Sequence, residues 1–295
     1  MENNAKIMDG ILVSTSLKNS IQHEVEKFVG LGNARPHLAA VMIGENPASQ
    51  SYIRNKLKSC EEVGFRSTLI TPDANISQEE LLKIITDLNV DESVDGYIVQ
   101  LPLPKHINET TVTFAINHEK DVDGFHPMNV GKMALGMPSF IPATPLGILE
   151  MLKFYNITTV GKKVVVVGRS NIVGTPLSIL LSRKGFDATV TLVHSKTENL
   201  MHETSQADIL IAAIGIPYFV KENMVKKGAV VIDVGINRVE APETKSGYKL
   251  VGDVAYEDVV SKCSYITPVP KGVGPMTVAV LMLNTLQAYK KKILN

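Results

Sequence analysis

The sequence predicts an α/β protein of two domains, an N-terminal βαβ domain followed by a domain built on a parallel sheet. Three observations predict this class. From about His37 to the end, apolar runs of strand-like composition alternate with longer segments of helical period. The chain has 295 residues, which exceeds the roughly 150 of an average domain. A segment rich in Pro and Gly, GMPSFIPATPLG at 136–147, marks a candidate boundary between the two halves.

Three strands are expected in the first half, at 37–43, 65–70 and 95–101. Helices are expected between them, near 48–63 and 77–89. The first of these helices should end at Gly64, because glycine readily adopts the left-handed conformation that closes a helix.

Four strands are expected in the second half, at 163–168, 188–194, 208–214 and 229–235. Their continuous Val and Ile runs are typical of strands covered on both faces of a parallel sheet. Helices fill the gaps, and the one at 174–184 has Pro176 in its first turn, where a missing N–H costs little. The last segment, PMTVAVLMLNTLQAYKKK, reads as a closing helix whose lysines favour its negative end.

Composition narrows the class of partner. Thirty Lys and Arg balance thirty Asp and Glu, so the chain lacks the positive field that binding to nucleic acid requires. No apolar run approaches the ~20 residues that span a bilayer, and the polar start MENNAKIMDG is unlike a signal peptide. We therefore expect a cytoplasmic protein that binds neither nucleic acid nor membrane. Cys60 and Cys263 lie far apart, which favours two buried thiols over a disulfide or a zinc site.

The stretch VVVVGRSNIVGTP resembles a nucleotide-binding turn with unusual glycine spacing. Gly168 is followed by Arg169 and Ser170, and the next glycine is Gly174, so the pattern G-x-G-x-x-G is not met. The order strand, turn, helix is nevertheless present. Backbone N–H groups at the start of such a helix point at a bound anion, so the turn predicts a phosphate site of Rossmann type.

The following strand indicates which dinucleotide this site takes. An enzyme that uses NAD has an acidic residue ~20 residues after the turn, whereas this strand ends in LVHSKT, with His194 and Ser195 and no carboxylate. Arg169 and a hydroxyl group suit a 2′-phosphate, because the guanidinium presents forked donors. NADP is therefore favoured over NAD. The alternative is that Arg169 is a solvated turn residue.

Candidate substrate residues lie in the first half. Tyr52 and Lys56 are spaced i, i+4 on one helix face that follows the carboxyl end of a strand, although a pair of surface residues is the alternative reading. Gln100 ends the strand in DGYIVQLPLP, and Asp121 and Asp123 lie in the polar loop EKDVDGFHPMNVGK. This loop lacks the ligand set of a calcium or zinc site, so no metal is expected.

Together these stretches resemble the bifunctional methylenetetrahydrofolate dehydrogenase/methenyltetrahydrofolate cyclohydrolase family over nearly the whole chain. Any one motif alone is weak, but nine in this order are specific. The motifs are PASQSYIRNKLKSC, DGYIVQLPLPKH, EKDVDGFHPMNVGK, PATPLGILEML, VVVVGRSNIVGTP, HSKT, DVGIN, GDV and TPVPKGVGPMTVAVLM.

The resemblance implies an enzyme of one-carbon metabolism and purine biosynthesis. It would oxidise 5,10-methylenetetrahydrofolate with NADP and hydrolyse the resulting 5,10-methenyltetrahydrofolate to 10-formyltetrahydrofolate. It also implies a folate-binding catalytic domain at 1–145, completed by the helix at 276–295, and a Rossmann-type NADP domain at 146–275, with the active site in a cleft between them. A homodimer paired through the cofactor domains is implied as well.

The resemblance further implies roles for single residues. Tyr52 would stack on the aminobenzoyl part of folate, Lys56 would be the catalytic lysine, Gln100 would bind that lysine and the substrate, and Asp123 would anchor the pterin. Residues that line the substrate cleft would be Gly272, Gly274 and Pro275. Residues that bind the cofactor would be Gly168, Arg169, Ser170, Ile172, Gly174, His194, Ser195 and Ile236.

Two positions depart from the family pattern. Ala143 replaces a usual cysteine, on which none of these roles depends. Lys271 replaces the first glycine of a G-G-V-G-P loop, and a lysine costs about 1 kcal/mol or more there if the position requires a positive φ.

Three alternative functions remain open at this stage. The chain could be a family member that retains only the dehydrogenase, or an NADP oxidoreductase that acts on another small substrate. It could also be a non-catalytic protein that senses a nucleotide, although such a sensor has no use for Lys56.

Overall fold

The computed structural model describes residues 5–45, 47–244 and 247–294. The chain forms two compact units. Among the described residues, the six-stranded unit contains 5–14 and Thr144–Thr277, and the three-stranded unit contains Thr15–Ala143 and 278–294. Two long helices, α1 (Gly10–Gly30) and α10 (Gly274–Leu294), each contribute residues to both units. No helix in the described residues has the length and apolar character needed to cross a membrane.

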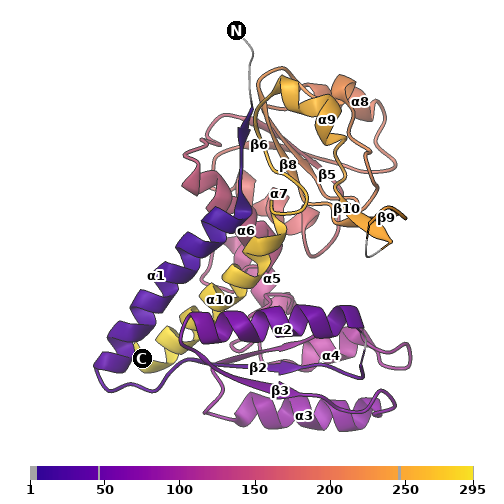
Figure 1. The fold of residues 1–295 in the computed structure, drawn as a ribbon. Coiled ribbons are helices and arrows are strands. Elements are labelled where there is room, and N and C mark those ends of the chain that lie inside the picture. The colour runs from indigo at the N-terminus through magenta and orange to yellow at the C-terminus, as the bar shows by residue number, and fades with distance from the viewer. Residues whose placement is uncertain (1–4, 46, 245–246, 295) are drawn as a thin grey trace. The chain divides into compact units, whose positions relative to one another are not determined.

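The three-stranded unit confirms the strands predicted in the first half, with shorter bounds. Its parallel sheet has the order β3-β2-β4, and its strands are β2 (His37–Val41), β3 (Arg66–Ile70) and β4 (Gly96–Val99). Figure 1 shows α2 on one side of this sheet and α3 on the other. The helices are α2 (Pro47–Glu62), α3 (Gln78–Val90), α4 (Glu109–Ala115) and α5 (Pro127–Leu135).

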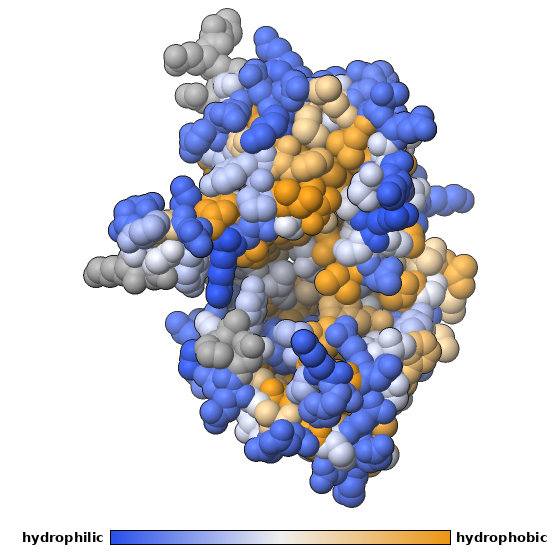
Figure 2. All heavy atoms as spheres, turned by 90° about the vertical axis from the view of Figure 1, so that its right-hand side faces the viewer, coloured by the Kyte–Doolittle hydropathy of each residue, from blue (hydrophilic) through white to orange (hydrophobic). Residues whose placement is uncertain are grey.

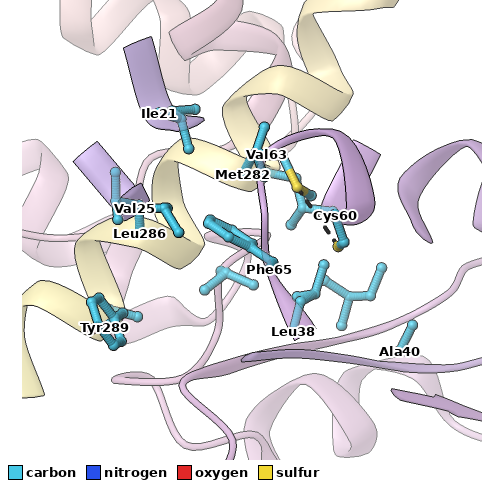
Figure 3. Packing of buried hydrophobic residues seen from close by; sticks show 14 of the residues in the cluster. Ile21, Val25, Leu38, Ala40, Cys60, Val63, Phe65, Met282, Leu286 and Tyr289 are labelled. Atoms are coloured by element: carbon cyan, nitrogen blue, oxygen red, sulfur yellow. Dashed lines mark hydrogen bonds between the residues drawn. The ribbon is translucent and has the colours of Figure 1, made fainter. Parts of the chain in front are cut away.

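The alternation of side chains along β2 explains these two layers. Leu38 and Ala40 belong to one buried cluster, and Ala39 and Val41 belong to the other, because successive strand residues point to opposite faces. The first cluster joins β2 to α1, α2 and α10, as Figure 3 shows. Its members drawn there include Ile21, Val25, Leu38, Cys60, Phe65, Met282 and Leu286.

The six-stranded unit confirms the four predicted strands of the second half and adds two. Its sheet has the order β1-β11-β8-β7-β5-β6, and all its strand pairs are parallel. The strands are β1 (Lys6–Ile7), β5 (Lys163–Val167), β6 (Thr189–Val193), β7 (Ile209–Ala212), β8 (Ala229–Asp233) and β11 (Cys263–Ile266). A separate antiparallel hairpin is formed by β9 (Asn237–Glu240) and β10 (Tyr248–Val251).

The helical elements of this unit fall between its strands. The α-helices are α6 (Ala143–Phe154), α7 (Gly174–Ser182), α8 (Leu200–Ser205) and α9 (Tyr256–Val259), and the 3-10 helices are η1 (Glu222–Met224) and η2 (Val260–Lys262).

The two compact units divide the chain differently from the expected domains at the N-terminal end. The first domain was expected to begin at residue 1, but residues 5–14 lie in the six-stranded unit, because β1 pairs with β11. A two-residue strand is too short to show a periodic pattern, so its sequence carries no signal of this pairing. The two later boundaries, at Ala143/Thr144 and Thr277/Val278, lie within two residues of those expected.

Both cysteines are buried and free, one in each unit. Burial raises the pKa of Cys60 and of Cys263 to about 12, so both thiols stay protonated and unreactive at neutral pH. On the face drawn in Figure 2, hydrophilic residues predominate, and apolar residues reach the surface between them in several places.

Candidate active site

Lys56 and Gln100 form the centre of the site in the three-stranded unit. Lys56 is half-buried on α2, and its Nζ donates to Gln100 Oε1 at 3.1 Å. Gln100 follows β4, where its backbone N–H donates to Val41 O and its Nε2 donates to Leu101 O at 2.7 Å. The second of these bonds fixes the amide with its oxygen toward the lysine. The lysine therefore has a neutral carbonyl acceptor, which accepts from an amine or an ammonium group alike.

Asp123 lies close enough to Lys56 for the two charges to interact. Its side chain is half-buried, and burial raises its pKa, while the charge of Lys56 lowers it in part. Asp121 also raises the pKa of Asp123, because two negative charges lie close together. A half-buried acceptor near a cation suits the N–H donors of a heterocycle.

The neighbouring aspartate has a structural role instead. Asp121 is buried, and its Oδ2 accepts from His126 N at 2.8 Å and from Asn129 Nδ2 at 3.0 Å. Asp121 therefore fixes the loop that presents Asp123. In the described part of the chain, no three His, Cys, Asp or Glu side chains are grouped so as to hold a metal ion.

Two further residues shape this loop. Gly124 has φ +75°, and a Cβ there would lie 2.8 Å from Ile141 C, so the turn after Asp123 requires glycine. Asn284 of α10 is fully buried, and its Nδ2 donates to Val122 O at 2.8 Å and to Ile141 O at 3.0 Å. Sequence reasoning missed Asn284, although a lone amide on the apolar segment VLMLNTL was an available signal.

Tyr52 lies one helical turn before Lys56 on α2, with 51% of its surface exposed. Its ring is therefore open to a flat partner. Four of the residues predicted to bind substrate come from three elements of one unit: Tyr52 and Lys56 from α2, Gln100 from the end of β4, and Asp123 from the loop after α4.

The remaining predicted residues lie in the six-stranded unit. The turn after β5 is held close to its surroundings by glycines. A Cβ on Gly168, which has φ +114°, would lie 2.2 Å from Ala213 O, and a Cβ on Gly174 would lie 1.9 Å from Gly168 O. The unusual glycine spacing therefore still gives a tight turn between β5 and α7.

Ser170 and Arg169 differ in their surroundings at this turn. Ser170 Oγ accepts from Val173 N at 3.2 Å and from Gly174 N at 3.4 Å, at the start of α7. Its hydroxyl hydrogen can still be donated to an anion. The Arg169 side chain is exposed, while its carbonyl accepts from Thr175 Oγ1.

His194 and Ser195 follow β6, the sheet neighbour of β5. His194 N donates to Thr197 Oγ1 at 2.9 Å, and His194 Nδ1 accepts from Lys196 N at 3.2 Å. Ser195 is exposed. Because β5 and β6 are parallel, Arg169 and Ser195 leave the same edge of the sheet.

Exposed isoleucines follow three adjacent strands of this sheet. Ile172 comes after β5, Ile216 after β7 and Ile236 after β8, and each is about half exposed. Apolar side chains at the carboxyl ends of parallel strands fit the flat rings of a dinucleotide, whose phosphates would meet Arg169. The residues present therefore fit NADP. Ile216 was not predicted, although GIP directly after the strand at 208–214 was an available signal.

The glycine loop before α10 lines a cavity of about 260 Å³. Its lining includes Ile236, Lys271, Gly272, Gly274 and Pro275. Lys271 has φ +82°, so this position has the positive φ that glycine would adopt without strain. The loop keeps its place against α1, since Gly10 N donates to Lys271 O at 2.8 Å.

Replacing this lysine should stabilise the protein. Lys271→Gly removes the strain of a lysine in the left-handed conformation, so we expect the free energy of unfolding to rise by about 1 kcal/mol. The greater backbone entropy of glycine in the unfolded chain offsets part of this gain. Urea denaturation measures the change. As a control, Lys249→Gly in β10 should lower stability, because glycine weakens a strand. An equal loss at both positions would contradict strain at Lys271.

Comparisons with known proteins place the chain in a family. The model of the tetrahydrofolate dehydrogenase/cyclohydrolase catalytic domain matches residues 8–123, and that of the NAD(P)-binding domain matches residues 142–293. The bifunctional protein FolD of Azobacteroides pseudotrichonymphae is 55% identical over 97% of this chain and 99% of its own. That of Bacteroides thetaiotaomicron is 54% identical over 97% and 99%.

Solved structures agree with these matches. The bifunctional FolD of Campylobacter jejuni superposes with a TM-score of 0.92 at 45% identity, over 98% of this chain and 99% of that one. The methylenetetrahydrofolate dehydrogenase-cyclohydrolase of Trypanosoma brucei, complexed with NADP cofactor and inhibitor, superposes with a TM-score of 0.93 at 37% identity, over 99% of each chain. The chain belongs to the tetrahydrofolate dehydrogenase/cyclohydrolase family.

Proposed function

We propose that this chain oxidises 5,10-methylenetetrahydrofolate with NADP⁺ and hydrolyses the 5,10-methenyltetrahydrofolate formed to 10-formyltetrahydrofolate. The observation that carries the proposal is the Lys56–Gln100 hydrogen bond beside Asp123, in a chain that matches both domains of the family. A nucleotide sensor would have no use for this arrangement, whereas the second reaction requires a group that moves protons.

The six-stranded unit would bind the cofactor. Arg169 and Ser195 would hold the 2′-phosphate, Ser170 would donate to a phosphate, and the exposed side chains of Ile172 and Ile236 would contact the rings. When bound, NADP⁺ supplies a hydride acceptor in its nicotinamide ring. This step needs alignment, with the two carbons roughly 3 to 3.5 Å apart, more than it needs an acid or base.

The three-stranded unit would bind the folate. The exposed ring of Tyr52 would stack on the aminobenzoyl group. The Asp123 carboxylate would accept hydrogen bonds from the N–H groups of the pterin.

Lys56 would move the protons of the second reaction. Water adds to the electrophilic methenyl carbon and loses a proton, which the neutral amine of Lys56 accepts. Ring opening then breaks the bond from this carbon to the nitrogen at position 5, and the ammonium gives its proton to that nitrogen. The hydroxyl oxygen loses its own proton to solvent as the formyl C=O forms, so the reaction releases one proton overall and leaves Lys56 neutral. Gln100 Oε1 accepts from the lysine in both states, so it holds the side chain in place throughout.

The proposal extends to assembly and location. As the family resemblance implies, the protein would be a cytoplasmic homodimer paired through its six-stranded units.

Arg169 gives a test of cofactor preference. Loss of a charged hydrogen bond costs about 1.5 to 3 kcal/mol, so Arg169→Ala should raise the KM for NADP⁺ by about tenfold or more and leave that for NAD⁺ nearly unchanged. Initial rates with each cofactor measure this. Arg66→Ala, which removes an exposed arginine from β3, is the matched control. Equal losses for NADP⁺ and NAD⁺ would mean that Arg169 does not contact the 2′-phosphate.

The proposed function itself is tested by absorbance. Purified protein mixed with methylenetetrahydrofolate and NADP⁺ should produce reduced cofactor, while omission of either reactant should produce none. Absence of reduced cofactor with both reactants present would contradict the proposal.

A further inference from the structure

We propose that Asp253 is a positioning residue that sets the affinity for NADP⁺, because it fixes the two loops that carry Ile216 and Ile236. The inference rests on the cofactor site proposed above. Asp253 belongs to the motif GDV, and Ile236 belongs to the motif DVGIN. Ile236 is the only residue of these two motifs to which the proposed function gives a role.

Asp253 joins the loop after β7 to the loop after β8. The residue is completely buried, and its Oδ2 accepts from Ile214 N at 2.7 Å and from Gly215 N at 3.0 Å. Its Oδ1 accepts from Asn237 Nδ2 at 2.9 Å. Gly215 directly precedes Ile216, and Asn237 directly follows Ile236. One carboxylate therefore holds the backbone next to both exposed isoleucines.

A second buried carboxylate holds Asp253 itself. Asp233 ends β8 with 3% of its surface exposed, and it accepts from the N–H groups of Gly235, Asp253 and Val254, each at 2.9 Å. Asp233 N in turn donates to Thr267 Oγ1 at 2.7 Å. The two aspartates thus form one network that is satisfied by hydrogen-bond donors.

The glycines of both motifs make room for these carboxylates. A Cβ on Gly235 would lie 2.3 Å from Asp253 Oδ1, and a Cβ on Gly252 would lie 1.8 Å from Asp233 Oδ2. Each motif therefore supplies one carboxylate and one glycine, and each glycine accommodates the carboxylate of the other motif. This reciprocity accounts for D-x-G in one motif and G-D in the other.

The network bears on the cofactor because buried hydrogen bonds determine where the two loops lie. Asp253→Asn keeps the shape of the side chain but replaces one acceptor oxygen by an NH₂ group, so at least one N–H loses its acceptor. We expect the Kd for NADP⁺ to rise by about tenfold or more.

The test compares Asp253→Asn with a matched carboxylate in the same sheet. Asp208 accepts from Lys163 N at 2.9 Å and from Lys226 Nζ at 2.6 Å, at the amino end of β7. Calorimetric titration gives the Kd for NADP⁺. The rate of hydrolysis of added methenyltetrahydrofolate, measured without cofactor, is the second readout. A general loss of structure would reduce this rate as well as the affinity for NADP⁺.

The expected result is a raised Kd in Asp253→Asn, with methenyltetrahydrofolate hydrolysis unchanged, and an unchanged Kd in Asp208→Asn. An unchanged Kd in folded Asp253→Asn, or an equal rise in both variants, overturns the proposal. If Asp253→Asn does not fold, Asn237→Ala takes its place, because it removes one donor of the same network. A Kd for NADP⁺ in Asn237→Ala equal to that of the wild-type protein would then overturn the proposal. Failure of the wild-type protein to bind NADP⁺ would instead overturn the proposed function.

Discussion

Replacing Lys56 by methionine should abolish hydrolysis of methenyltetrahydrofolate while the protein stays folded. Methionine keeps the length of the side chain but cannot carry a proton, and addition of water with ring opening requires one to be moved. The measurement supplies methenyltetrahydrofolate directly and follows the loss of its absorbance, with folding checked by circular dichroism.

The control for this variant lies on the same helix. Lys58 is exposed, and residues two apart on a helix do not share a face, so Lys58→Met should hydrolyse at the wild-type rate. Hydrolysis at that rate by Lys56→Met would show that Lys56 is an ordinary surface lysine. Dehydrogenase activity should fall less than hydrolysis, because hydride transfer needs no proton from a side chain. A ~1 Å displacement of substrate would still reduce it on the order of a hundredfold.

Asp123→Ala should weaken folate binding with little change in the affinity for NADP⁺. A hydrogen bond to a charged acceptor contributes about 1.5 to 3 kcal/mol, so a pterin that loses this carboxylate should bind on the order of a hundredfold more weakly. Separate titrations with folate substrate and with NADP⁺ measure the two affinities. Asp87→Ala, which removes an exposed carboxylate from α3, should change neither.

The pH dependence of folate binding should follow the protonation of the Asp123 carboxylate. Burial raises the pKa of Asp123, so the carboxylate gains its proton at a higher pH than an ordinary aspartate, and one of its two oxygens then becomes a donor in place of a charged acceptor. The KM for folate should therefore rise as the pH falls through that pKa, and this rise should be absent from Asp123→Ala. If NADP⁺ binding were lost instead of folate binding, the loop that carries Asp123 would belong to the cofactor site.

The parts of the fold that sequence could predict are those with a strong local pattern. The Val and Ile runs of β5 and β8 are buried along their length, and this pattern is visible in sequence alone. By contrast, α1 buries residues on a narrow stripe that includes Ile21 and Val25, and β1 has two residues. Their places are decided by partners far along the chain, which a local pattern does not record.

The same distinction applies to the candidate site. Gln100 and Arg169 follow predicted strands, at ends where ligands bind, and Lys56 lies one turn after Tyr52 on a helix that follows another strand, so their positions could be inferred. The roles of Asn284 and Asp253 depend on which carbonyl and N–H groups tertiary folding brings beside them. Such contacts leave only a weak trace in sequence, as a polar residue within an apolar segment or a carboxylate beside a glycine.

One measurement tests most directly whether this chain performs both reactions. The protein is incubated with methylenetetrahydrofolate and limiting NADP⁺, and the amounts of reduced cofactor and of 10-formyltetrahydrofolate are measured over time. An enzyme-free sample corrects for spontaneous hydrolysis of methenyltetrahydrofolate. The account predicts equal molar amounts of the two products, with 10-formyltetrahydrofolate formed faster than spontaneous hydrolysis allows. Reduced cofactor accompanied by methenyltetrahydrofolate that decays only at the spontaneous rate would contradict it and leave a dehydrogenase alone.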